Sequence, residues 1–275
     1  MYRDISMKKQ CLLSLLLCTT VLSGCATHSN STAISIERKL VPVLSGTPLS
    51  IDLNANYLPP EYKGDNLDEL INKFEKISIK DEYETTSSHI SRLQNAVDNN
   101  IYAFMREIEF KLIEYNADSQ ILSISFIPTF TNSKEHLLYF LISSKLKNTG
   151  NYTGENAYGV SRDVKEYNEE ETALLVNSSI NKEAATSINI TNIKPEEARK
   201  VGGLNYMNMG IMYICKIHNP SGLDKIAFED SDFLKATITR PSEYTITRHF
   251  LNVDLYQVWV FDKTSGKVLT KQNIN

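Results

Sequence analysis

The sequence contains no apolar run of the roughly 20 residues that a membrane-spanning helix needs, no pair of cysteines at ligand spacing and no basic run. Its 275 residues include only 11 Gly, 8 Pro and 4 Cys, and 23% are charged, which excludes collagen-like, disordered and multi-span membrane proteins. Without a clustered basic footprint, binding to nucleic acid or to an anionic lipid surface is not expected. The composition is that of an ordinary globular protein with one domain or two small ones.

Motifs of common catalytic chemistry are also missing. The sequence has no Walker loop, no dinucleotide-binding Gly pattern, no nucleophile elbow, no H-E-x-x-H and no Cys pair. The five histidines are scattered, and no two of them lie at ligand spacing: His28, His89, His136, His218 and His249. We therefore predict no catalytic residue, no cofactor and no metal site, although a metal site assembled from distant strands stays open.

The N-terminus has the features of a secretory signal. A basic start at Met7–Gln10 precedes an apolar core at Cys11–Val21, which is too short to span a membrane. Asp4 lies where the signal should be positive. We therefore expect the biological start at Met7, with residues 1–6 as an extension.

The end of this signal, Leu22-Ser23-Gly24-Cys25, resembles the bacterial lipobox. The resemblance implies that Cys25 receives a diacylglycerol thioether and becomes the first residue of a membrane-anchored lipoprotein. Ala26 and Thr27 follow in place of the Asp that retains lipoproteins on the inner membrane, which implies the outer membrane, facing the periplasm. The alternative is an ordinary signal cleaved elsewhere, with Cys25 incidental.

Cleavage before Cys25 changes the charge and the cysteine inventory. Residues 1–24 hold three of the 29 basic and one of the 33 acidic residues, so the remaining chain has a formal net charge of −6. Cys215 becomes the single free thiol, so no intrachain disulfide can form. It alternates with Tyr213 and Ile217 on one strand face, which predicts a buried thiol rather than a catalytic nucleophile.

We expect a signal at 1–24, a lipidated Cys25 with a tether and irregular connection over 25–59, and one α+β domain over 60–275. The tether is polar at Ala26–Thr32. Periodicity and capping residues predict helices over 66–76, 85–97 and 195–200. The fold class is a short helical lead-in packed on a mainly antiparallel β-sheet with a C-terminal β-hairpin. Further strands are predicted at 121–126, 137–146, 157–164, 172–176, 187–191 and 210–217.

Two segments carry most of the fold prediction. Residues 101–115 fit both periodicities, and we assign a strand to the later half because a turn signal follows at Asn116–Ser119. The longest strand is expected at Tyr244–Phe261, whose odd positions give an apolar face that includes Leu255 and Trp259 and is broken by Gln257. A turn over Asp262–Lys267 then leads into the last strand.

Polar residues give three candidate sites, each with a simpler explanation. The first is a polar groove lined by Asn156, Tyr158, Arg240 and Arg248, residues that can also simply face water at strand edges. The second is an acid/base pair among Asp81, Glu82 and Glu84, which lie before a helix start that favours carboxylates. The third is a calcium site at the acidic stretch Glu229, Asp230 and Asp232, which lacks the Gly and the final Glu of a calcium loop and is more simply explained as a solvated acidic turn.

Three short sequence segments resemble segments of a group of bacterial exported proteins with no known activity. They are Lys80–Thr86 with Arg92, Tyr152–Val160, and Phe261-Asp262 followed by Gly266-Lys267-Val268. The resemblance spans roughly residues 60–270 and implies one continuous domain. It implies no ligand.

Two function classes remain. We favour a non-enzymatic envelope lipoprotein that is held to the membrane through Cys25 and binds another envelope protein or a glycan. The alternative is a hydrolase of cell-wall or lipid material, with a site assembled from distant residues. A cleft with paired carboxylates or Ser–His contacts would favour the hydrolase, whereas an exposed apolar patch or a free sheet edge would favour the binding protein.

Overall fold

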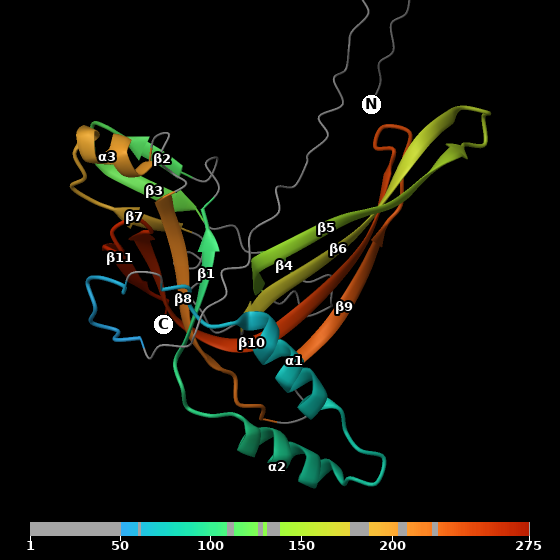
Figure 1. Ribbon diagram of the computed structural model, residues 1–275, viewed down its shortest axis with the longest axis horizontal. Coiled ribbons are helices and arrows are strands. Elements are labelled where there is room, and N and C mark those ends of the chain that lie inside the picture. Colours follow the sequence, from blue (N-terminus) through green and yellow to red (C-terminus); the bar gives the residue numbers. More distant parts are fainter. Residues whose placement is uncertain are drawn as a thin grey trace, which may run out of the picture. The chain divides into compact units, whose positions relative to one another are not determined.

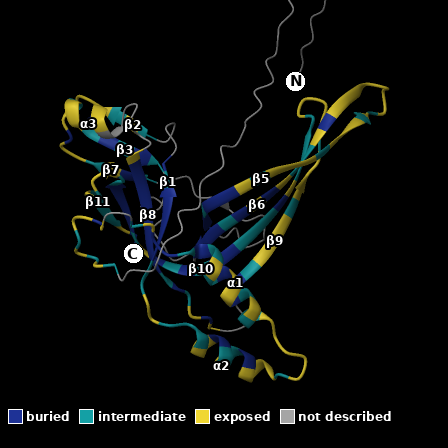
Figure 2. Cartoon of the chain, in the orientation of Figure 1, coloured by how far each residue is buried: buried dark blue, intermediate teal, exposed yellow. Residues whose placement is uncertain are grey.

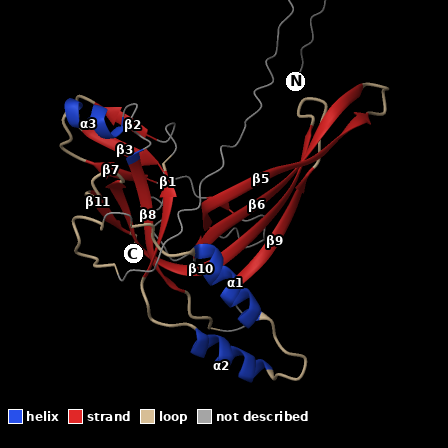
Figure 3. Cartoon of the chain, in the orientation of Figure 1, coloured by secondary structure: helices blue, strands red, loops and turns tan. Residues whose placement is uncertain are grey.

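The computed structural model describes residues 51–59, 62–108, 113–125, 129–130, 138–176, 187–202, 208–221 and 225–274. The signal, Cys25 and the tether lie outside these residues. The α+β prediction is confirmed, with few helices and mainly strands (Figures 1 and 3). The elements are α1 (Leu67–Ser78), α2 (Thr86–Ala96), β1 (Tyr102–Glu107), β2 (Ile113–Asn116), β3 (Ile121–Ser125), β4 (Thr129–Phe130), β5 (Leu138–Glu155), β6 (Ser161–Val176), β7 (Ser187–Ile190), α3 (Pro195–Gly202), β8 (Met209–Ile217), β9 (Ala227–Leu234), β10 (Ser242–Asp262) and β11 (Val268–Asn273).

All three predicted helices form within two residues of their expected bounds. Asn66 caps α1 by accepting a hydrogen bond from the Glu69 amide (3.2 Å), and Thr85 caps α2 by accepting one from Ser88 N (3.1 Å). The i, i+4, i+7 spacing places Leu67, Ile71 and Phe74 on one buried face of α1. That face packs against β9 and β10 of the main sheet.

Strand β10 is the central strand of the main sheet, because it pairs with four other strands. Its first part, Ser242–Val253, pairs in parallel with β6, while Tyr244–Leu251 pairs antiparallel with β9. Its last part, Val253–Asp262, pairs with β8, and Gln257–Phe261 pairs with β11. We call β5, β6, β9 and residues 242–251 of β10 the arm. We call β1, β8, β11 and residues 253–262 of β10 the base sheet.

A β-bulge between Leu255 and Gln257 reverses which side chains of β10 face the main core. Leu255 before the bulge and Val258 and Val260 after it belong to that core. Trp259 and Phe261 point to the opposite face and pack in a second core. The predicted continuous apolar face of odd positions is therefore wrong beyond Leu255, because one extra residue shifts the two-residue period.

The structure corrects one other strand prediction and bears out part of another. Residues 157–160 do not begin a strand but form the turn of a long hairpin, in which β5 pairs with β6 from Leu138–Val176 out to Glu155–Ser161. In the ambiguous segment, the strand predicted for the later half is present at Ile113–Tyr115, which lie in β2, while Ile108 lies outside any strand. The earlier half also forms a strand, β1, which pairs with β8. Residues 109–112 lie outside the described part. The predicted turn at Asn116–Ser119 and the C-terminal hairpin are confirmed.

In the base sheet, β1 and β8 are almost wholly buried, residues 253–262 of β10 are mostly buried and β11 is half-buried (Figure 2). One face joins α1, α2 and the three-stranded sheet β2–β3–β7 in the main core, while α3 packs beside Leu122 on that smaller sheet. The other face, with Met212, Ile214 and Trp259, is packed by Ile51, Leu53 and Leu58. Residues 51–58, which we call the strap, also bond to the C-terminal hairpin, through Leu58 N to Gly266 O at 2.7 Å. Residues packed on the sheet thus begin before residue 60.

Candidate functional site

The four residues of the predicted polar groove do not form one site. Asn156 and Tyr158 lie in the β5–β6 turn, Arg240 lies in the β9–β10 loop, and Arg248 lies within strand β10. Arg248 is eight residues beyond Arg240, which corresponds to more than about 20 Å along an extended strand. The structure therefore separates Arg248 from the other three, whereas the turn and the loop both lie where arm strands end.

Asn156 builds the β5–β6 turn. Its Oδ1 accepts hydrogen bonds from the amides of Tyr158 (2.9 Å) and Val160 (3.0 Å), and Gly159 adopts a left-handed φ of +76°. This local geometry leaves the Tyr158 side chain 91% exposed. Asn156 is thus a structural residue that presents an aromatic side chain to solvent.

The β9–β10 loop, residues 235–241, is closed by bonds within itself. Thr237 N donates to Arg240 O at 2.9 Å, Arg240 N donates back to Thr237 O at 3.1 Å, and the Arg240 guanidinium donates to Lys235 O at 3.0 Å. Between these residues, Ile238 is 48% exposed. The loop therefore presents an apolar side chain between two basic residues.

Exposed apolar side chains lie toward the ends of the arm strands in two groups, one on the β5–β6 hairpin and one on the end of β9 with the β9–β10 loop. The arm end, as we call this set, consists of Tyr152, Tyr158, Val160, Phe233, Leu234 and Ile238, with exposed fractions of 42%, 91%, 44%, 61%, 38% and 48%. Figure 2 shows the tip of the β5–β6 hairpin as exposed, in contrast to the buried β8 and β1. The strand registers place Phe233 level with Asn168 of β6 and Tyr158 in the turn beyond Ser161, so the two groups are separate, and each is a candidate interaction surface.

Sequence reasoning found only Tyr158 of the arm end. Of the other members, only Val160 lies in a predicted strand, and the remaining four lie in segments to which no element was assigned. One signal is the segment Phe233–Pro241, which contains apolar residues and two basic residues but no acidic residue.

Arg248 holds a charge cluster within the arm. Its Nε donates to Glu171 at 2.7 Å, and its Nη1 donates to Asp232. Burial opposes the charge on the guanidinium, but Asp232 and Glu171 outweigh that effect and raise the pKa of Arg248 above its usual value. With its side chain only 13% exposed, Arg248 is a structural residue and not part of an open groove. Asp232 thus does not form a solvated acidic turn.

A small groove of about 180 Å³ lies between α1 and the arm. It is lined by Asp68, Ile71, Asn72, Ser143, Lys145, Glu170, Thr172 and His249. The groups that resemble a hydrolase site are engaged elsewhere, since Ser143 Oγ pairs with Thr172 Oγ1 and His249 Nδ1 lies 3.1 Å from Glu75 Oε1. The groove therefore has hydroxyls and an imidazole, but it does not show the Ser–His contact that the alternative function requires.

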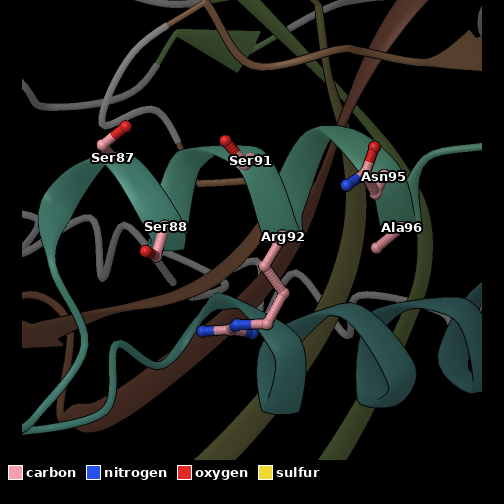
Figure 4. A pocket seen from close by; sticks show the side chains of 6 residues that line it. All are labelled: Ser87, Ser88, Ser91, Arg92, Asn95 and Ala96. Atoms are coloured by element: carbon pink, nitrogen blue, oxygen red, sulfur yellow. The ribbon is translucent and has the colours of Figure 1, made fainter.

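A second, shallower depression lies on the surface of α2 (Figure 4). One helix supplies all its lining residues, among them Ser91, Arg92 and Asn95. Figure 4 shows the Arg92 side chain reaching toward the neighbouring helix. Its guanidinium donates to Ile79 O, at the C-cap of α1, at 3.1 Å and to Glu84, in the loop between α1 and α2, at 2.8 Å. The depression is an exposed polar helix face.

The acidic residues before α2 do not form a pair of carboxylates, because Glu84 forms an ion pair with Arg92. The hydrogen bond from Arg92 lowers the pKa of Glu84 to about 2. His89 Nδ1 also lies 3.2 Å from Glu84. Arg92 thus keeps Glu84 ionised, so Glu84 is suited to fixing the α1–α2 loop and not to acting as a general acid.

The remaining predicted residues are structural or lie outside the described part. Cys215 is fully buried, as predicted, and burial raises the pKa of its thiol well above the usual value. His218 lies 2.8 Å from Asp254, whereas His28, His136 and Cys25 fall outside the described residues. Among the described residues, no three His, Cys, Asp or Glu side chains gather as metal ligands would. No helix in that part is long and apolar enough to cross a membrane.

Similarity to other proteins adds no assignment at this point. Comparisons of the chain with protein-family models, with curated proteins and with solved structures found no match.

Proposed function

We propose that this chain is an envelope lipoprotein without enzymatic activity, anchored through Cys25 to the periplasmic face of the outer membrane, and that the arm end is its interaction surface. Anchoring is supported by Leu22–Cys25, placed directly after an apolar signal core. Two or more acyl chains hold a protein stably on a bilayer, because each buried methylene contributes about 0.8 kcal/mol.

The single observation that supports the interaction role is the exposed arm end. Tyr158 and Phe233 are 91% and 61% exposed, although this chain buries Trp259 and Phe74 completely. Leaving large apolar side chains in water forfeits roughly 1.5–3 kcal/mol for each, so their exposure favours a surface that is covered when the protein acts.

The hydrolase alternative has weaker support. Its best candidate, the groove beside α1, has Ser143 paired with Thr172 and His249 paired with Glu75. A general base must lie within hydrogen-bond reach of the proton that it removes. No observation in the described residues favours a reaction over binding.

Site-specific photo-crosslinking in living cells tests the interaction role. A photoreactive amino acid replaces Tyr158 in one strain and Tyr83 in another, because both tyrosines are 91% exposed and only the first belongs to the arm end. We expect a discrete adduct from position 158 and none from position 83. Equal labelling at both positions would refute the arm end as the interaction surface.

The anchor is tested separately. Cys25→Ala should abolish fatty-acid incorporation and lipoprotein-type cleavage, whereas Cys215→Ala should leave both unchanged, because Cys215 is buried in the folded chain. Undiminished palmitate labelling of Cys25→Ala would overturn the anchoring proposal.

A further inference from the structure

The groove between α1 and the arm is polar and is built by a helix and three strands. Two rows of side chains that lie level in the strand registers form its floor: Ser143, Thr172 and His249, and beside them Lys145 and Glu170. Three residues of α1 form its wall at the spacing i, i+3 and i+4, which places them on one helix face: Asp68, Ile71 and Asn72. The packing of α1 on the sheet thus creates a site that no single element contains.

Asp68 lacks hydrogen-bond donors in this groove. Its Oδ2 lies 3.6 Å from Lys145 Nζ, and its Oδ1 is shielded from water and has no hydrogen-bond partner among the described residues. A carboxylate is an acceptor, and leaving a shielded acceptor without a donor costs free energy. The Asp68 side chain is 31% exposed, so a donor placed in the groove can reach the carboxylate.

His249 and Glu170 are further acceptors. His249 Nδ1 lies 3.1 Å from Glu75 Oε1, and because a carboxylate accepts, Nδ1 carries the proton. In the neutral imidazole Nε2 is then an acceptor, and within the part of the chain that the structure describes it has no partner. Glu170 is exposed and has no hydrogen bond or ion pair in that same part. The groove thus offers acceptors without donors to match them.

The charge of the groove favours a cation. Among the described residues of its lining, Asp68 and Glu170 are acidic and Lys145 is basic, so one positive less two negative charges leaves −1 with His249 neutral. Glu75, behind the imidazole, adds to the negative potential. In the described residues no three His, Cys, Asp or Glu side chains gather as metal ligands would. An organic cation with N–H donors therefore matches the groove better than a metal ion does.

The size of the groove limits its occupant to a small molecule. Its volume of about 180 Å³ corresponds to about six water molecules, at about 30 Å³ each. Ile71, which also lines the groove, provides an apolar part of the wall. A short aliphatic chain that ends in an ammonium group combines this size with one apolar and one positively charged end.

We propose that the groove between α1 and the arm is a binding site for a small primary alkylammonium ion. The N–H groups of the ion donate to Asp68, with His249 and Glu170 as further acceptors, and its carbon chain lies against Ile71. Lys145 opposes binding, because its like charge lies beside the same carboxylate. The site is separate from the arm end and from Cys25, so its test does not depend on the proposed function.

Titration of the full chain with butylammonium, followed by two-dimensional ¹⁵N NMR, tests the site. The matched neutral probe is 1-butanol, which keeps the carbon chain and a donor but lacks the charge. We expect butylammonium to shift the backbone amide signals of Ser143, Thr172 and His249 together. The dissociation constant should be on the order of 1 mM, because so small a ligand makes few contacts. Butanol should leave the three signals unchanged.

Variants assign the binding to the charge of Asp68. Asp68→Asn keeps the shape of the side chain and should weaken binding by at least about fivefold, the factor that a unit charge at about 4 Å contributes in water. Glu69→Gln makes the same charge change in the same helical turn, but Glu69 is exposed and does not line the groove, so binding should be unchanged. Lys145→Met should strengthen binding, which a merely structural role of the groove would not produce.

Thermal unfolding of each variant shows whether it is folded, and if Asp68→Asn is not, the gain from Lys145→Met decides the question. Equal shifts with butanol and butylammonium would overturn the proposal. So would undiminished binding by a folded Asp68→Asn protein, or the same shifts produced by Mg²⁺ at lower concentration, which would assign the groove to a metal ion. Nα-acetyl-lysine methylamide distinguishes the two sources of the group: binding as tight as that of butylammonium supports a partner's lysine side chain, and no binding supports a free amine.

Discussion

The base sheet and the arm share strand β10, but the two parts of this strand differ in how far their side chains are exposed to water. Residues 253–262 of β10 place Leu255, Val258 and Val260 against one core and Trp259 and Phe261 against another. In residues 242–251 of the same strand, most positions are half-buried, and only Ile246, Phe250 and Leu251 are buried. Hydrogen-bonded pairing of strands alone therefore does not determine which part of the sheet is stable. Burial of the faces of the sheet under other elements determines it.

The largest expected effect comes from removing a large side chain of the base sheet. Trp259 is fully buried, donates to Gln257 Oε1 at 2.9 Å, and has Lys271 Nζ 4.0 Å from its ring centre. Trp259→Ala should lower the free energy of unfolding by about 3–5 kcal/mol, as measured by urea denaturation. Tyr158→Ala, in the arm end, should change it by no more than about 0.5 kcal/mol. Similar losses for the two variants would contradict the comparison.

The arm should show a large loss only where its charges are buried. Arg248→Ala leaves Glu171, whose side chain is 4% exposed, without its guanidinium partner. We expect a loss of about 2 kcal/mol, below the range for a fully buried pair because Arg248 keeps some contact with water. Arg248→Lys should recover part of this loss, while Arg162→Ala, at an exposed position, serves as the neutral control. An unchanged denaturation midpoint for Arg248→Ala would rule out a structural role for the cluster.

A smaller effect separates a glycine that faces a buried ring in the base sheet from a glycine of the arm whose close neighbours include the half-exposed Tyr152. A Cβ at Gly210 would overlap the Phe261 ring, whereas one at Gly154 would lie 3.2 Å from Val164 Cγ2. Gly210→Ala should cost about 1–3 kcal/mol because the core is overpacked, and Gly154→Ala should cost about 0.5 kcal/mol or less. Phe261→Leu combined with Gly210→Ala should recover stability. If the double variant is no better than Gly210→Ala alone, ring overlap is the wrong cause.

The smallest effect concerns the loop before α2, which belongs to neither region and provides a reference. The folded protein lowers the pKa of Glu84 from the ordinary 4.5 to about 2, so the pair with Arg92 stabilises folding above pH 4.5. That contribution is lost as the pH falls toward 2. Thermal unfolding of Arg92→Met should therefore differ most from the unsubstituted protein near pH 7, and the two should converge in acid. A difference that grows in acid would contradict this linkage, and Arg199→Met on α3 is the control.

The sequence predicted what depends on local pattern. Helix caps such as Asn66 and Thr85, and the turn after Asp262, lie within a few residues of the structure they specify. The thiol of Cys215 was placed in the core by simple alternation. The lipidation of Cys25 stays a prediction, because that residue lies outside the described part.

Two features could not be derived from local pattern. The bulge near Tyr256 interrupts the alternation of β10 without any glycine or proline to mark it, so a constant period assigned Trp259 to the wrong face. The arm end depends on how far strands extend past the covering helix, which is a property of tertiary packing. For this reason Phe233 and Ile238 were not distinguished from ordinary strand and loop residues, although they are exposed.

The central position of β10 also affects the order in which the sheet folds. Strand β6, its parallel partner, ends at Val176, and the hydrogen bond from Arg248 to Glu171 joins residues that are 77 positions apart in the sequence. Strands β8, β9 and β11 also pair with β10. Such distant pairings are slow to form. The main sheet therefore cannot be completed before residues 242–262 are in place, whatever the order in which its other strands form.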